Sequence, residues 1–118
     1  MNTSKAQKIG EHFVYQWNNT SEDEHAKLYD ENVEFTCSLT QRIINATNGK
    51  ITGNKTLIAY WELLKKKFPE SKMNHIKSSW YNNKIVIQLT IPPFSDNAYG
   101  IIELNKENKI SQLRISHV

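Results

Sequence analysis

Residues 76–91 read IKSSWYNNKIVIQLTI, and this stretch decides the fold class. In its second half, isoleucine or leucine stands at every second position, a period that is typical of a β-strand with one buried face. The pair Asn82-Asn83 separates residues 76–81 from residues 84–91. Because asparagine tolerates the positive φ of a tight turn, the stretch predicts an antiparallel hairpin.

Three further segments read as strands around this hairpin. Residues 33–39 alternate apolar and polar side chains, so one face carries the apolar ones. After Pro92-Pro93 and a predicted loop at residues 95–97, strands are expected at residues 99–104 and 110–118. The faces predicted to point inward carry Val33, Phe35, Cys37 and Leu39 on the first of these strands and Leu113, Ile115 and His117 on the last.

Two long amphipathic helices are predicted, at residues 4–18 and 54–68. Ile9, Phe13 and Trp17 recur every four residues in the first, which builds one apolar stripe. The second ends where Pro69 stops it. Its apolar face carries Leu57, Ile58, Trp61, Leu64 and Phe68.

A short helix is predicted between the first long helix and the first strand. Ser21 and Glu24 form the capping-box pattern Ser-x-x-Glu. The helix is expected to carry Ala26, Leu28 and Tyr29 and to end at residues 30–32. Residues 41–48 fit either a strand or a flap.

This order of elements predicts an α+β fold, with helices first and a meander of strands afterwards. A curved, mainly antiparallel sheet wrapped around the amphipathic helices forms a cone, and an open end of that cone is a pocket. With 118 residues, the chain is expected to be a single domain over residues 1–118.

Composition and charge narrow the function classes. The net charge of +3 is too small to argue nucleic-acid binding, and Lys65-Lys66-Lys67 is interpreted as a solvated helix end that complements the helix dipole. No signal-peptide or membrane-spanning run of apolar residues is visible, so a cytoplasmic location without membrane contact is expected. Cys37 is the single cysteine and has no partner for an internal disulfide.

Four groups of residues carry a family resemblance across nearly the whole chain. They are Phe13-x3-Trp17-Asn18; LYDENVEF at 28–35; GKITG at 49–53 running into Leu57-Ile58 and Tyr60-Trp61; and GIIEL at 100–104 followed by Asn108-Lys109-Ile110. In their order and spacing the chain resembles the nuclear transport factor 2-like superfamily, especially its small SnoaL-like branch. The resemblance implies a conical α+β barrel of cystatin-like topology with a deep pocket, and a homodimer that pairs through the outer face of the sheet.

The resemblance also tests a known chemistry. Ketosteroid isomerases of this fold use a Tyr on the first helix, an Asp base on the first strand and a protonated Asp on a later strand. On this chain these positions fall at Phe13, Phe35 and near Gly100, which cannot move a proton. The neighbouring Glu34 and Tyr99 are expected to point outward because of the period of two. The pattern therefore argues against steroid isomerase and SnoaL-like cyclase chemistry.

Three function hypotheses remain open. The first is a module that binds a small, mostly apolar molecule in an aromatic-lined pocket, with no chemistry or cofactor of its own. The second is an isomerase, cyclase or dehydratase that uses His117, a residue that titrates near neutrality, or a residue of 41–48. The third is a homodimeric protein-interaction module. The residues predicted to line the pocket are Phe13, Trp17, Phe35, Cys37, Trp61, Ile87, Leu89, Ile102, Leu113 and Ile115.

The other polar residues are given structural interpretations. His12, His25 and His75 show no metal-ligand spacing, and His25 is interpreted as part of a solvated helix face. Cys37 is interpreted as a small buried residue rather than a nucleophile. The polar outer face of the sheet is the predicted dimer interface, with Arg114 expected opposite Glu103. That face is expected to carry Glu34, Gln88, Thr90, Glu103, Gln112 and Arg114.

Overall fold

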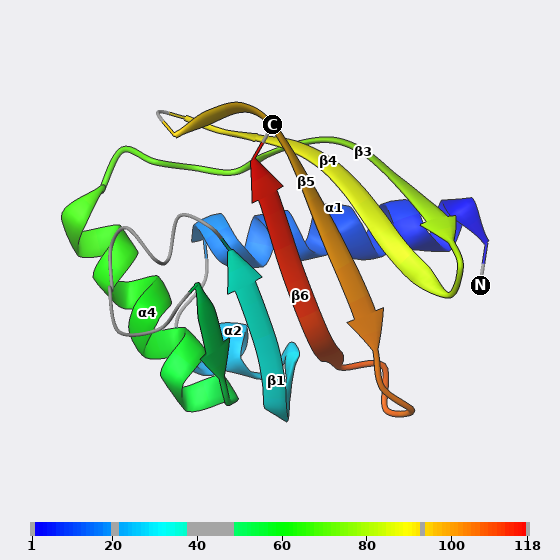
Figure 1. Cartoon of the computed structure of the whole chain (residues 1–118), viewed down its shortest axis with the longest axis horizontal. Helices are drawn as coiled ribbons and strands as arrows, with labels where there is room; N and C mark the ends of the chain where they lie inside the picture. Colours follow the sequence, from blue (N-terminus) through cyan, green and yellow to red (C-terminus); the bar gives the residue numbers. More distant parts are fainter. Residues whose placement is uncertain (1, 20–21, 38–48, 93, 118) are drawn as a thin grey trace.

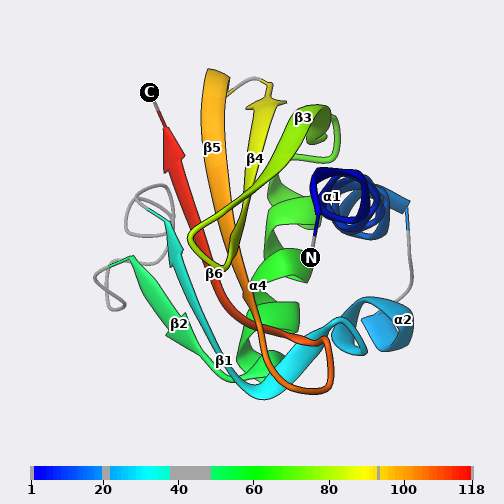
Figure 2. The ribbon, with the colours of Figure 1, turned by 90° about the vertical axis from the view of Figure 1, so that its right-hand side faces the viewer.

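A computed structural model describes residues 2–19, 22–37, 49–92 and 94–117 of the chain. The described elements form one layer of helices against one sheet (Figures 1 and 2). The helices are α1 (Thr3–Asn19), α2 (Glu22–Ala26) and α4 (Asn54–Lys67). The strands are β1 (Tyr29–Cys37), β2 (Lys50–Thr52), β3 (Asn74–Tyr81), β4 (Lys84–Ile91), β5 (Ser95–Leu104) and β6 (Ile110–His117).

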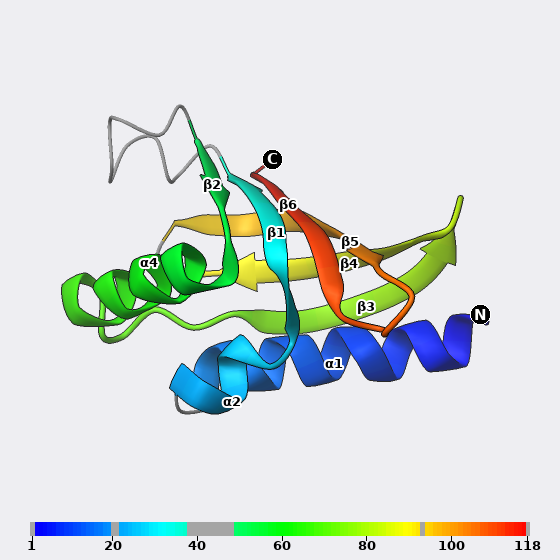
Figure 3. The ribbon, with the colours of Figure 1, turned by 90° about the horizontal axis from the view of Figure 1, so that it is seen from below.

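The strands form a curved mixed sheet in the order β2-β1-β6-β5-β4-β3. Its β1–β6 pairing is parallel and the other pairings are antiparallel. The predicted α+β class and the mainly antiparallel sheet are therefore confirmed. The sheet is not closed, since β2 and β3 are its two edges, so the cone is incomplete (Figure 3). None of the described helices is long and apolar enough to cross a membrane.

Helix α1 lies against β3, and a glycine sets how closely the two approach. The helix begins after Asn2, whose side-chain oxygen accepts a hydrogen bond from the backbone N–H of Lys5 at 2.9 Å. A Cβ at Gly10 would lie 2.0 Å from the Oγ atom and 3.0 Å from the Cβ atom of Ser78 on β3. Gly10 therefore permits a contact that any larger residue would push apart.

The hairpin of β3 and β4 forms as the sequence predicts. Asn82 and Asn83 have φ angles of 50° and 62°, which is the backbone of a tight hairpin turn. Trp80 pairs with Ile85, whose side chain is fully buried, so the indole lies on the inner face of the sheet and packs on the core. Strand β3 begins two residues before the predicted start because Asn74 still pairs with Thr90.

Two predicted boundaries are wrong. Tyr29 does not belong to the short helix, which ends at Ala26, but begins β1 beside Ile110. A backbone hydrogen bond of 2.8 Å from Ile110 to the carbonyl of Leu28 holds this start. Residues 95–97 are not a loop, since β5 begins at Ser95, opposite Ile91. Long-range pairing thus outweighs the local turn propensity of these residues.

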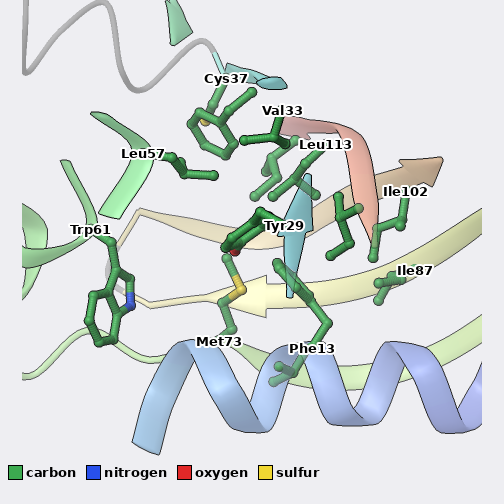
Figure 4. Close-up of a cluster of buried hydrophobic side chains, with 14 of the residues drawn as sticks. Phe13, Tyr29, Val33, Cys37, Leu57, Trp61, Met73, Ile87, Ile102 and Leu113 are labelled. Carbon is green, nitrogen blue, oxygen red and sulfur yellow. The ribbon is translucent and has the colours of Figure 1, made fainter. Parts of the chain in front are cut away.

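The core lies between the inner face of the sheet and helices α1 and α4 (Figure 4). Phe13 of α1, Leu57 of α4 and alternate residues of β1, β4, β5 and β6 meet there. Their exposed fractions are close to zero, which fits a packed interior. On the strands, the fully or almost fully buried apolar side chains are Tyr29, Val33, Phe35, Ile85, Ile87, Leu89, Ala98, Ile102 and Leu113.

The outer face of the sheet is polar, as predicted, but one predicted pair is wrong. Arg114 lies opposite Ile101, and Glu103 lies opposite Gln112. Glu103 instead forms an ion pair with Lys84 of β4 at 3.5 Å. The strand register, which sequence parity does not supply, decides which charges meet across the sheet.

Candidate functional site

An apolar hollow lies between α4, the C-terminal end of α1 and the inner face of the sheet. We call it the aromatic pocket. Its volume is about 50 Å³, and it is partly open to the outside. Aromatic contacts build its wall: Phe35 stacks on Trp17 at 6.4 Å between ring centroids, and Phe68 meets Phe94 edge-on at 4.7 Å. Its described lining residues are Trp17, Asn18, Phe35, Cys37, Tyr60, Trp61, Leu64, Lys65, Phe68, Ser71, Met73, Ile91, Phe94 and Ile115.

Half of the predicted pocket residues line this hollow, and the other half lie elsewhere. Trp17, Phe35, Cys37, Trp61 and Ile115 border the aromatic pocket. The remaining five are buried in the core outside the pocket, with Leu113 also beneath the outer face of the sheet. They are Phe13, Ile87, Leu89, Ile102 and Leu113. Strand parity identifies a buried face, but it does not say where along that face a space remains.

Asn18 fastens the end of α1 to the segment that leads into β3. Its Nδ2 donates to the carbonyl of Met73 at 2.7 Å, and its Oδ1 accepts from the N–H of Met73 at 2.9 Å. The amide nitrogen and the amide oxygen of Asn18 are thus both hydrogen-bonded to the backbone of Met73. The side chain of Asn18 therefore shapes the pocket rather than offering it a free polar group.

Trp61 and Lys65, one turn apart on α4, close the other side of the pocket. The indole Nε1–H of Trp61 donates to the carbonyl of Trp17 at 2.8 Å, which ties α4 to α1. The ammonium of Lys65 lies 4.5 Å from the centre of the Trp61 ring and donates to the carbonyl of Asn18 at 3.1 Å. Partial burial lowers the pKa of Lys65. The pocket therefore carries a positive charge at its border.

His25 is not on a solvated face, and this interpretation of the sequence is wrong. The side chain is fully buried, with its ring edge-on to Trp61 at 4.5 Å and to Trp17 at 5.5 Å. Its Nε2 shares a hydrogen bond of 2.7 Å with the hydroxyl of Tyr29, which is itself buried. In the described part of the chain, Nδ1 of His25 has no hydrogen-bond partner.

Burial sets the protonation states of this pair. Desolvation, with a smaller contribution from the positive charge of Lys65, lowers the pKa of His25 to about 4. Desolvation also raises the pKa of Tyr29. At neutral pH both side chains are uncharged, and they lie behind the two tryptophans rather than on the pocket wall. The pair is a polar element of the core.

The comparisons with known proteins identify the fold. No family model and no curated protein matches the chain. Among solved structures, a SnoaL-like protein of unknown function from Burkholderia thailandensis superposes with a TM-score of 0.87 at 14% identity, covering 100% of this chain and 98% of the other. The chain has the SnoaL-like, nuclear transport factor 2-like fold.

Two further neighbours show the range of proteins that share the SnoaL-like fold. A protein with a ketosteroid isomerase-like fold from Catenulispora acidiphila, solved in complex with trimethylamine, has a TM-score of 0.73 at 8% identity and covers 93% of this chain and 85% of its own. The epoxide hydrolase/cyclase-like enzyme SalBIII, which acts in pyran ring formation in the polyether salinomycin, has a TM-score of 0.71 at 15% identity. The match covers 98% of this chain and 92% of SalBIII. Shared fold does not transfer function.

The positions of the isomerase acids are apolar in this SnoaL-like fold. Phe13 is buried in the core, Phe35 forms pocket wall, and Gly100 lies between Ile87 and Ile115 on the neighbouring strands. Glu34 points to the outer face and pairs with Lys50 at 3.4 Å. Among the described residues that line the pocket, none is Asp, Glu or His.

Some predicted catalytic positions lie outside the described residues. They include residues 41–48 and the side chain of His117, whose backbone pairs with Ala98 in β6 and β5. Ser21, the predicted helix cap, and Leu39 also lie outside them. The roles assigned to these residues stay predictions.

Several pocket residues were missed by sequence reasoning. Tyr60 and Leu64 were not predicted to line the pocket, although both follow the same stripe of α4 as Trp61. Phe68, which caps the end of α4, was among the aromatic residues predicted to surround a cavity, and it does line the pocket. Ser71, Met73 and Phe94 come from connecting segments, which have no period to extrapolate. Asn18 carried a signal: it follows directly on Trp17 at the end of a helix, where an amide often binds a neighbouring backbone.

Proposed function

We infer that this chain binds a small, mostly apolar molecule in the aromatic pocket and performs no chemistry of its own there. The observation that carries the proposal is the pocket wall itself. Among its described residues it combines tryptophan, phenylalanine and aliphatic side chains with one cation and no acid or imidazole. Such a surface supplies apolar contact and one orienting charge, which is the usual composition of a small-molecule site.

The size of the pocket limits the ligand. A volume of about 50 Å³ corresponds to the room of roughly three to five water molecules. The enclosed part of the ligand is therefore a group of a few heavy atoms, and anything larger extends through the open side. The neighbour solved with trimethylamine holds a molecule of that size, which supports a ligand of this scale.

The charge at the border favours one kind of ligand. The ammonium of Lys65 already faces the ring of Trp61 and the carbonyl of Asn18, and it has further donor capacity. A carboxylate, carbonyl or hydroxyl of a ligand is attracted to it, whereas an ammonium is repelled. We therefore expect a branched or single-ring apolar group that carries a negative or neutral polar end.

A matched ligand series tests the proposal. Isobutyrate, isobutanol and isobutylammonium share one branched apolar group and differ in charge. Titration followed by amide chemical shifts and tryptophan fluorescence is expected to show saturable binding near residues 61–65, strongest for isobutyrate, with a dissociation constant of about 1 mM. Isobutylammonium binding as tightly as isobutyrate contradicts the role of Lys65.

A filled-pocket variant locates the binding. Cys37→Leu adds side-chain atoms to the pocket wall and is expected to abolish the shifts. Ile102→Val is the matched control, because Ile102 is fully buried but does not line the pocket. Equal binding by both variants, with both folded by circular dichroism, overturns the proposal.

The two other hypotheses make separate predictions. An enzyme that uses His117 or residues 41–48 is expected to lose turnover on substitution of those residues while binding in the aromatic pocket persists. The homodimer is proposed through the outer sheet face, where Glu34, Lys50, Lys84 and Glu103 bring both charge signs to one surface. Elution at the mass of the 13.7 kDa monomer contradicts the dimer.

A further inference from the structure

A second hollow borders the N-terminal half and the middle of α1, whereas the aromatic pocket borders the C-terminal end of that helix. It is an open groove of about 560 Å³ between α1, the segment after α2 and the β5–β6 hairpin, three segments that meet in Figure 3. We call it the basic groove. Its twelve described lining residues are Lys5, Lys8, Ile9, His12, Phe13, Lys27, Leu28, Leu104, Glu107, Asn108, Lys109 and Ile110.

The floor of the basic groove is apolar. Phe13 and Ile110 are buried at its base. Ile9, Leu28 and Leu104 are partly buried and pack on the core while one side of each faces the groove. These five side chains come from α1, the segment after α2, β5 and β6, so the floor exists only in the folded chain. An alkyl chain laid on it removes apolar surface from water.

The rim of the basic groove is positive. Four lysines stand on it against one glutamate, Glu107, and all five side chains are exposed. Lys27 is paired with Glu24 at 3.0 Å. The lysines at positions 5, 8 and 109 form no ion pair with the residues that the structure describes. The carboxylate of Asp30 is close enough to Lys109 to balance part of its charge. The groove therefore has an excess of positive charge above an apolar surface, supplied mainly by Lys5 and Lys8.

The hairpin that carries Lys109 is held in place by hydrogen bonds. Asn105 accepts from the backbone N–H groups of Glu107 and Lys109 at 2.8 and 3.0 Å, and its Nδ2 donates to Asp30 at 2.7 Å. Ile110 donates to the carbonyl of Leu28 at 2.8 Å. The position of Lys109 relative to the floor is thus preorganised, which lowers the cost of binding.

We propose that the basic groove binds an anionic amphiphile, a carboxylate with an unbranched alkyl chain. The chain lies over Ile9, Leu28 and Leu104, and the carboxylate meets the ammonium groups of Lys8 and Lys109. A folded protein partner fits less well, because a stable interface takes about 20–30 residues on each side, more than line this groove. The volume is within the range of small-molecule sites.

The test uses octanoate, 1-octanol and octylammonium as probes on the full chain, mapped by amide chemical shifts. Octanoate is expected to saturate with shifts at residues 8–9, 28 and 108–110, and to weaken as salt rises from about 20 to about 300 mM. Octanol is expected to bind more weakly, and octylammonium most weakly. Shifts confined to the aromatic pocket, or no saturation by octanoate, overturn the proposal.

Two charge-reversal variants supply the matched comparison. K8E/K109E is expected to weaken octanoate binding by about tenfold or more. K72E/K77E changes the net charge equally, at two exposed lysines that line neither hollow and lie away from the basic groove. It is expected to change octanoate binding by less than about twofold. Equal weakening by both variants shows only a general charge effect and contradicts the site.

Two further outcomes separate this site from its alternatives. Cys37→Leu, which fills the aromatic pocket, is expected to leave octanoate binding in the basic groove unchanged. The proposal for the groove and the proposal for the aromatic pocket can therefore be refuted separately. Groove shifts that follow protein concentration instead of octanoate indicate a second copy of the chain. Saturation by an acidic amphipathic peptide without saturation by octanoate indicates a protein partner. Either of these last results overturns the proposal.

Discussion

The middle and the C-terminal end of helix α1 meet the rest of the molecule in opposite ways. At its middle, Gly10 lies so close to Ser78 of β3 that no side chain fits between them. At its C-terminal end, Trp17 and Asn18 border a hollow, and behind them His25 keeps a ring nitrogen without a partner among the described residues. The middle of α1 is tightly packed, while its C-terminal end borders a space and a polar group without a partner among the described residues.

This difference shows which part of α1 is stabilised by close packing and which part lies beside an unfilled space. The tight contact fixes α1 against the sheet with small residues, in the way that close-packed interiors require. The C-terminal end of α1, the loose end, is held by a few hydrogen bonds and by the ring contacts of Trp17, with the aromatic pocket beside them. Substitutions at the middle of α1 and at its C-terminal end are therefore expected to change stability by different mechanisms and by different amounts.

The largest expected effect is the pH dependence of the loose end. His25 has a pKa of about 4 in the folded protein, against an ordinary histidine pKa of 6.5. Between these values the unfolded chain binds a proton that the native chain does not, so the free energy of unfolding falls as pH falls. The loss is expected to begin near pH 6.5 and to reach about 3 kcal/mol near pH 4. Urea denaturation across this range measures it.

A double variant isolates the contribution of His25. His25→Phe with Tyr29→Phe removes both partners of the buried hydrogen bond and keeps aromatic volume among Trp17 and Trp61. Removal of both partners is expected to be nearly neutral at pH 7. The acid-dependent loss between pH 6.5 and 4 is expected to shrink by most of its magnitude. An unchanged pH profile places the acid sensitivity in other groups.

The second effect comes from disrupting the close contact between Gly10 of α1 and Ser78 of β3. Gly10→Ala gains helix propensity, worth about 1 kcal/mol at an unconstrained site, but its methyl group overlaps Ser78. Because the Cβ of Ser78 is itself only 3.0 Å away, rotation of the hydroxyl does not relieve the clash. We expect a net destabilisation of about 2 kcal/mol, measured by urea denaturation. In a Ser78→Gly background the same substitution is expected to be neutral or stabilising; a full cost there contradicts the steric explanation.

The third effect loosens the hydrogen bonds that hold the loose end. Asn18→Ala removes two hydrogen bonds to the backbone of Met73 and is expected to cost about 2 kcal/mol. Asn19→Ala is the matched control, because its amide only donates to Tyr15 on the exposed side of the helix, and it is expected to cost less than about 0.5 kcal/mol. Thermal unfolding of both variants compares them, and equal costs contradict the role of Asn18.

The same contrast explains what the sequence predicts and what it does not. The periods of two and of 3.6 identify buried faces, so the helices, the hairpin at Asn82-Asn83 and the core were predictable. Strand register is a long-range property, and so Arg114 was assigned the wrong neighbour. His25 was misplaced because α2 has only five residues, too few to show a buried face.

The candidate site was predictable only where it shares a face with the core. Trp17, Phe35 and Trp61 follow periodic patterns, while Ser71 and Phe94 enter from connecting segments. The basic groove was not predictable for a similar reason: Lys8 of α1 and Lys109 of the β5–β6 hairpin are separated by most of the chain, and they border one groove only in the folded structure. Charges that converge through topology leave no local signal.

The smallest expected effect links the aromatic pocket to the buried histidine. Lys65→Gln removes the ammonium from above Trp61 and is expected to cost about 0.5–1 kcal/mol at pH 7, since this cation–π contact is on the surface. The positive charge of Lys65 also lowers the pKa of His25, as the smaller of its two causes. Its removal is expected to raise the pKa of His25 and so narrow the gap to the unfolded value. The total loss of stability between pH 7 and pH 4 is then smaller in the variant than in the parent chain.

The control for this coupling is Lys66→Gln, the neighbouring exposed lysine of α4, for which no contact with Trp61 is seen. It removes the same charge from the same helix turn, so any general effect of net charge appears in both variants. A difference between the two pH profiles isolates the local field of Lys65 at His25, and direct titration of His25 by NMR reads the same shift independently. Identical profiles contradict the coupling, and they also imply that a ligand anion bound at Lys65 leaves the buried pair undisturbed.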